Sequence, residues 1–88
     1  MNPYHAALSV AQGLEEAGFQ AYLVGGCVRD QLLGREPQDY DICTDALPDQ
    51  VQSLFPRTYA TGIRHGTVTV IVGGFPVEVT TFRIEGVY

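Results

Sequence analysis

The chain has 88 residues and a formal net charge of −5, and all five of its basic residues are arginines. Apolar residues make up 45% of the sequence, which is enough for the core of one small domain and excludes a disordered tail. The net negative charge argues against this segment being the main nucleic-acid-binding surface, because neutralising phosphates requires clustered cations.

The cysteines and the hydropathy of the chain bear on its location. Cys27 and Cys43 lack the C-x-x-C spacing of a metal or redox site, so we interpret them as buried, reduced thiols. No apolar run approaches the roughly 20 residues of a membrane-spanning helix. The N-terminus lacks the basic region of a secretory signal. We therefore expect a cytoplasmic protein.

The first half of the chain alternates helical and extended patterns. Residues 3–17 are predicted to form an amphipathic helix that Gly18 stops. The run QAYLV over residues 20–24 predicts a buried strand, and residues 27–34 predict a short helix. The apolar residues that recur at helical spacing in the first helix are Tyr4, Ala7, Leu8, Ala11 and Leu14.

The second half predicts strands around one more helix. DYDIC, residues 39–43, is read as a strand, and Pro48 is placed to open a helix that continues through Leu54. Residues 67–72 and 76–82 predict a β-hairpin with a glycine-containing turn. The helix would direct Val51, Leu54 and Phe55 inward. The order αβαβαββ indicates helices on a mixed β-sheet, hence an α/β or α+β fold.

Asp39 and Asp41 are the first chemical feature, because residues two apart in a strand project from the same face. Their carboxylates would then lie side by side while Tyr40 and Ile42 pack behind them. Glu78 is flanked by two valines and could join the pair if its strand lies alongside. Such oxygen ligands suit Mg²⁺ and could hold the two metal ions of a phosphoryl-transfer site. The alternative is that these acids are merely solvated on an open face.

Gly25 and Gly26 are the second feature, since they fall between a predicted strand and a predicted helix. Glycines let the backbone approach a phosphate, and Arg29 follows one turn later, where a guanidinium could brace a triphosphate. A Gly-Gly pair alone is more often only a turn. The G-x-G-x-x-G spacing of dinucleotide-binding proteins is absent. His65, between two glycines in GIRHG, is interpreted as a turn or supporting residue rather than a catalyst.

These motifs together resemble a known family. The run LVGGCVRDQLLGREPQDYDICT resembles the signature of the nucleotidyltransferase superfamily. More narrowly, V-R-D-x-L-L-G with HGTVTV and VEVTTFR is similar to the head domain of class II tRNA nucleotidyltransferases, the CCA-adding enzymes. Bacterial poly(A) polymerases share this pattern. The resemblance spans about residues 19–83.

The resemblance implies a magnesium-dependent enzyme that transfers nucleotides from CTP and ATP onto a tRNA 3′ hydroxyl and releases pyrophosphate. By position, Asp39 and Asp41 would bind the metal and Glu78 would be the third catalytic carboxylate. The residues that bind the nucleotide would be Gly25, Gly26 and Arg29. Arg83 falls where the family keeps a basic residue, with no role assigned.

Members of that family continue beyond the head into neck, body and tail segments that select the nucleotide and hold tRNA. We therefore expect residues 1–88 to be a head-domain piece of a larger enzyme, with little or no nucleotide addition by itself. Two alternatives remain open, namely a poly(A) polymerase of the same family and a non-catalytic nucleotide-binding module. The oligomeric state is left open.

Overall fold

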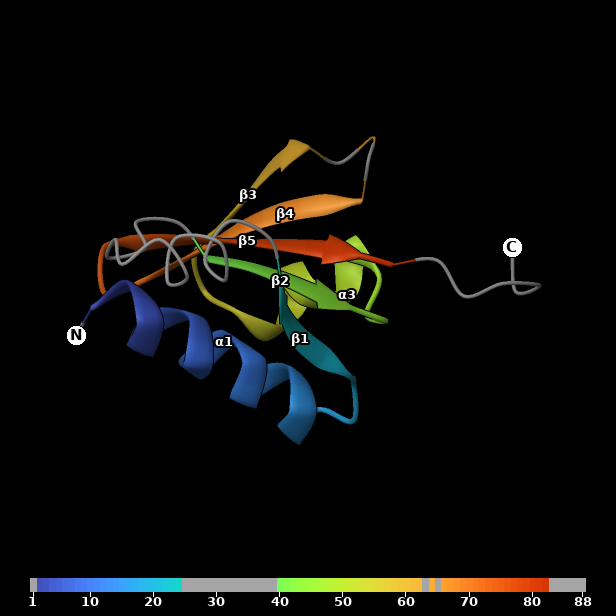
Figure 1. The fold of residues 1–88 in the computed structure, drawn as a ribbon. Coiled ribbons are helices and arrows are strands. Elements are labelled where there is room, and N and C mark those ends of the chain that lie inside the picture. Colours follow the sequence, from blue (N-terminus) through green and yellow to red (C-terminus); the bar gives the residue numbers. More distant parts are fainter. Residues whose placement is uncertain (1, 25–39, 63, 65, 83–88) are drawn as a thin grey trace.

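The computed structural model describes residues 2–24, 40–62, 64 and 66–82, and it has a mixed five-stranded sheet with helices on one face (Figure 1). In chain order the elements are α1 (Pro3–Glu16), β1 (Ala21–Val24), β2 (Tyr40–Thr44), α3 (Pro48–Leu54), β3 (Thr58–Gly62), β4 (Thr67–Val72) and β5 (Phe75–Thr81). The predicted α/β class with a mixed sheet is confirmed. The helix predicted over residues 27–34 lies outside the described residues.

Both ends of α1 are determined by local chemistry. The Asn2 side chain accepts a hydrogen bond from the His5 backbone N–H at 2.8 Å, and Pro3 occupies the first turn. At the other end Gly18 has a φ of 94°, and the backbone N–H of Phe19 reaches back to the Leu14 carbonyl at 2.9 Å. This is a Schellman ending, in which a glycine takes the left-handed conformation. The predicted stop at Gly18 is confirmed.

The strand order across the sheet is β1-β2-β5-β4-β3. The central pair β2–β5 is parallel, and the β1–β2, β5–β4 and β4–β3 pairs are antiparallel. The strand β3 was not predicted from the sequence. Its residues TYATG lack the apolar alternation of a half-buried strand, and they pair only with β4, at the edge of the sheet.

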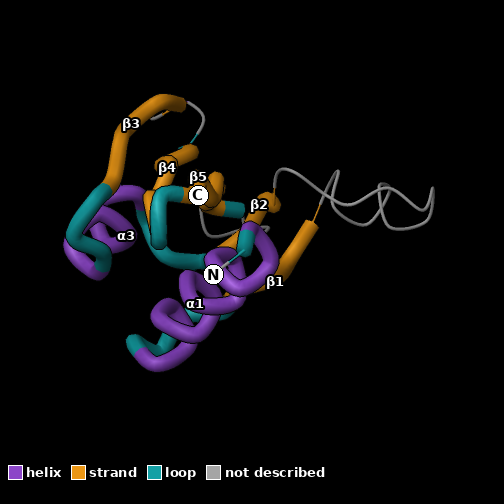
Figure 2. The backbone as a smooth tube through the Cα atoms, turned by 90° about the vertical axis from the view of Figure 1, so that its left-hand side faces the viewer, coloured by secondary structure: helices purple, strands orange, loops and turns teal. Residues whose placement is uncertain are grey.

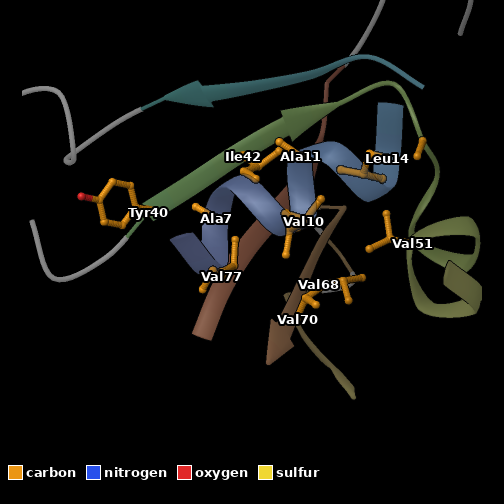
Figure 3. Close-up of a cluster of buried hydrophobic side chains, with 13 residues drawn as sticks. Ala7, Val10, Ala11, Leu14, Tyr40, Ile42, Val51, Val68, Val70 and Val77 are labelled. Atoms are coloured by element: carbon orange, nitrogen blue, oxygen red, sulfur yellow. The ribbon is translucent and has the colours of Figure 1, made fainter. Parts of the chain in front are cut away.

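Both helices pack on the same face of the sheet, as Figure 2 shows. The core between the layers consists of Ala6, Ala7, Val10, Ala11, Leu14, Tyr40, Ile42, Ala46, Val51, Val68, Val70, Val77 and Val79 (Figure 3). Two expectations were wrong in detail. Leu54 stays 38% exposed, and α1 turns Ala6 and Val10 inward while Tyr4 stays 41% exposed. The helical period was right, and Ala7, Ala11 and Leu14 of the predicted stripe are buried.

Neither of the helices that the structure describes has the length and apolar character needed to cross a bilayer. The thiol of Cys43 is free and half-buried. Cys27 lies outside the described residues.

Candidate active site

The face of the sheet opposite α1 and α3 carries the acidic residues. Along β2 the side chains alternate, with Tyr40 and Ile42 buried in the core and Asp41 half-buried on the other face. Along β5 the buried Val77 and Val79 flank an exposed Glu78. This is the alternation expected of strands with one face in the core. Throughout, we call the side of the sheet that neither described helix covers the open face.

Asp41 and Glu78 are brought together by the parallel pairing of β2 with β5. The two residues are partners in register, so their side chains leave adjacent strands at the same level of the open face. Neighbouring strands lie about 4.8 Å apart, which places two carboxylates within reach of one cation. The prediction that the strand of Glu78 lies beside that of Asp41 is confirmed.

Register partners of Asp41 and Glu78 extend the row across the neighbouring strands on both sides. Asp41 is in register with Val24 of β1, and Glu78 is in register with Thr69 of β4. Thr69 in turn is in register with Tyr59 of β3. Cross-strand partners point to the same face, so the side chains of Thr69 and Tyr59 lie on the open face with those of Asp41 and Glu78. We call this set of five register partners, Val24, Asp41, Glu78, Thr69 and Tyr59, the cross-strand row.

A hydrogen-bonded cluster at the carboxyl end of β2 fixes its neighbours in place. The buried Thr44 hydroxyl donates to the Gln20 carbonyl at 2.6 Å and accepts the Ala46 N–H at 3.1 Å. On the other side, the Thr81 hydroxyl donates to the Ala46 carbonyl at 2.6 Å. The Phe82 N–H donates to the Thr44 carbonyl at 2.9 Å. Because β1, β2 and β5 are all tied here, none can slip in register, and the cross-strand row keeps its alignment.

The turn of the β4–β5 hairpin fixes the register of Glu78 with its partner on β4. Gly73 and Gly74 have φ values of 57° and 84°, the left-handed pair that a two-residue type I′ turn requires. The bond from the Thr81 N–H to the Gly66 carbonyl at 2.9 Å then makes Thr69 and Glu78 a non-hydrogen-bonded pair. Side chains approach most closely at such pairs.

The remaining predicted site residues lie outside the described part of the chain. These are Asp39, Gly25, Gly26 and Arg29, together with His65 and Arg83. Among the described residues, no group of three or more His, Cys, Asp or Glu side chains is arranged to hold a metal ion. The described donors are therefore Asp41 and Glu78, two hard oxygen ligands on an open face, and this donor chemistry fits Mg²⁺. Asp39 directly precedes β2 in the chain.

Sequence reasoning missed Thr69 and Tyr59 as members of the row. The alternation in TVTVIV could have placed Thr69 on the open face, since Val68 and Val70 on either side are buried. No comparable signal marks Tyr59, because β3 itself has no periodic pattern. Only the pairing of β3 with β4 reveals its place.

Comparison with known proteins decides the family. The poly A polymerase head domain family matches residues 21–88, which is most of the chain. The chain belongs to this family. The match includes Asp41, Glu78 and every strand that the structure describes.

Relatives agree with that assignment. A CCA-adding enzyme of Geobacillus sp. (strain WCH70) is 54% identical over 86 residues, covering 98% of this chain and 21% of the relative. The crystal structure of the Bacillus stearothermophilus CCA-adding enzyme in complex with CTP superposes with a TM-score of 0.86 at 49% identity. That comparison covers 98% of this chain and 22% of the solved one.

A tRNA nucleotidyltransferase solved with a primer tRNA and an incoming ATP analog has a TM-score of 0.67 at 31% identity. That comparison covers 90% of this chain and 24% of the solved one. The chain thus spans about a fifth of the length of the relatives that it matches. This chain and these relatives share the head-domain fold.

Proposed function

We propose that this chain is the catalytic head of an RNA nucleotidyltransferase that adds CCA to tRNA 3′ ends from CTP and ATP. The observation that carries the proposal is the register of Asp41 with Glu78 on the open face. In a chain of this family, two carboxylates aligned on adjacent strands are the arrangement that a phosphoryl-transfer site needs.

The reaction is an in-line displacement at the α-phosphate of the incoming nucleotide. A bond forms between the RNA 3′ oxygen and phosphorus, the bond to the bridging oxygen breaks, pyrophosphate leaves, and the hydroxyl proton passes to solvent. Asp39 and Asp41 would hold magnesium, and Glu78 would lie beside the attacking oxygen. When bound, magnesium lowers the barrier by polarising the attacking hydroxyl and neutralising the departing phosphates. Gly25, Gly26 and Arg29 would hold the triphosphate.

The residues that hold Asp41 and Glu78 supply positioning rather than chemistry. Val77 and Val79 are buried on either side of Glu78, and Ile42 is buried beside Asp41. With these neighbours packed in the core, the backbone beneath each carboxylate is rigid, as an orienting site requires.

The substrates are proposed from the relatives. The Geobacillus relative is a CCA-adding enzyme, and one solved relative binds CTP while another binds a primer tRNA with an ATP analog. The activity and ligands of these relatives favour CCA addition over poly(A) addition for this chain. The domain assignment of residues 1–88, the tRNA-holding role of further segments and a cytoplasmic location belong to the same proposal.

Binding of CTP in the presence and absence of magnesium tests this function. We expect NMR signals of Asp41 and Glu78 to shift with CTP only when magnesium is present, and Asp41→Asn and Glu78→Gln to lose that dependence. Glu16→Gln is the matched control, because Glu16 is an exposed acid on α1, away from the open face. Binding of CTP that is indifferent to magnesium and unchanged in Asp41→Asn would instead indicate a non-catalytic nucleotide-binding module.

A further inference from the structure

The two ends of the cross-strand row differ. From one edge of the sheet to the other its members are Val24, Asp41, Glu78, Thr69 and Tyr59, because the strand order is β1-β2-β5-β4-β3. The predicted triphosphate glycines, Gly25 and Gly26, follow Val24 directly in the chain. If these glycines bind the triphosphate as proposed, the nucleotide lies toward the β1 end of the row.

In-line displacement then determines where the RNA lies. The attacking and leaving oxygens are on opposite sides of the phosphorus. If pyrophosphate departs toward the β1 end, the 3′ oxygen attacks from the side of Glu78. The terminal nucleoside that carries this oxygen must extend beyond Glu78, over β4 and β3. No other strand of the described sheet lies on that side.

Tyr59 is the exposed side chain that the terminal nucleoside would meet there. Thr69 is only 9% exposed, whereas Tyr59 is 51% exposed. Two strand spacings, roughly 10 Å, separate Tyr59 from Glu78, so a terminal nucleoside that extends away from Glu78 across β4 approaches Tyr59. The pairing of β3 with β4 is irregular between Tyr59 and Gly62, and such bulges re-aim side chains beside functional sites.

The positive charges beside β3 also suit an RNA ligand. The two arginines among the described residues are Arg57 and Arg64, and both are exposed. Arg57 directly precedes β3, and Arg64 follows it by two residues. The strand itself contains no acid. Although the whole chain is acidic, this edge of the sheet offers two cations to a polyanion.

We infer that β3 is the RNA-acceptor edge of the sheet, where the 3′-terminal base of a single-stranded RNA stacks on Tyr59 and its phosphates meet Arg57 and Arg64. Aromatic side chains bind unpaired bases in this way in many RNA-binding proteins. The inference rests on the proposed function, because it takes the direction of attack from that reaction.

The test uses a short single-stranded RNA with 2-aminopurine as its 3′-terminal base, added to the full chain. Stacking on Tyr59 should quench its fluorescence, and the same RNA labelled at its 5′ end should be quenched far less. Tyr59→Ala should remove the quenching and weaken binding about five-fold or more, whereas Tyr59→Phe should retain both. Binding of CTP with magnesium should be unchanged in Tyr59→Ala.

Tyr22→Ala is the matched control. Tyr22 is 53% exposed on the open face, but it lies on β1, at the opposite edge of the sheet. If Tyr22→Ala rather than Tyr59→Ala removed the quenching, the RNA would approach from the other side and the inference would be overturned.

The two proposals can fail separately. Magnesium-dependent CTP binding together with quenching that survives Tyr59→Ala, or with no quenching by the unaltered chain, overturns the RNA-acceptor edge and leaves the proposed function standing. Quenching that depends on Tyr59 in a chain that binds no CTP with magnesium contradicts the proposed function and leaves Tyr59 as an RNA contact.

Discussion

Asp41 and Glu78 are direct cross-strand partners on the open face, although a helix and two strands separate them in the sequence. Two carboxylates at this spacing repel each other across the strands. A bound divalent cation would offset that repulsion, because Mg²⁺ binds carboxylate oxygens. The alignment is therefore the feature from which the proposed magnesium site follows.

Removing one charge of this pair should stabilise the chain when magnesium is absent. Asp41→Asn is expected to raise the free energy of unfolding by about 0.2–1 kcal/mol, because like charges directly opposed across strands destabilise a sheet by that order. Urea unfolding with and without magnesium measures it. Magnesium should stabilise the unaltered chain and leave Asp41→Asn unaffected, since a ligand stabilises only the state that binds it. An equal effect of magnesium on both chains would argue against binding at Asp41.

The Thr44 hydroxyl should contribute to stability more than an exposed hydroxyl does. Thr44→Val keeps the shape of the side chain but leaves the Gln20 carbonyl and the Ala46 N–H without their partner. We expect a loss of about 1–3 kcal/mol in the free energy of unfolding, measured by urea titration. Thr44→Ser, which keeps the hydroxyl, should lose less. If valine and serine cost the same, the hydroxyl does not hold the strands.

The two glycines of the β4–β5 turn should differ in what they tolerate. Gly73 has a φ of 57°, which asparagine adopts readily, and Asn-Gly is a favoured type I′ pair. Gly73→Asn should therefore fold normally. Gly74→Ala should destabilise the chain by about 1 kcal/mol, because its φ is 84° and an added Cβ would meet no atom within 4 Å, so the cost lies in the backbone alone. Thermal unfolding of both variants checks this, and equal midpoints would contradict the turn type.

The arginines beside β3 should act through charge rather than through base recognition. Arg57→Gln and Arg64→Gln are each expected to weaken RNA binding to a similar extent for any sequence. Each should also lower the slope of log affinity against log salt by about 0.7, the value for one contact to single-stranded RNA. Fluorescence anisotropy over a salt series measures the slope. A loss that depends on the terminal base would assign the arginines a different role.

The faces of the strands could be predicted from the sequence because alternation alone decides which side chains enter the core. Asp41 between Tyr40 and Ile42, and Glu78 between Val77 and Val79, were placed correctly before any pairing was known. The stop of α1 at Gly18 and the start of α3 at Pro48 were also predicted, since capping depends on a few neighbouring residues.

The residues of each strand therefore specify its chemistry: which side chains are acids, and which face carries them. Packing in the folded chain specifies which strands are neighbours, that β2 and β5 run parallel, and that Asp41 is in register with Glu78. It also added β3, and with it Tyr59, to the edge of the site. Local propensities act over a few residues, whereas strand order and register come from packing between distant segments. For that reason the order of residues along the cross-strand row could be found only in the folded chain.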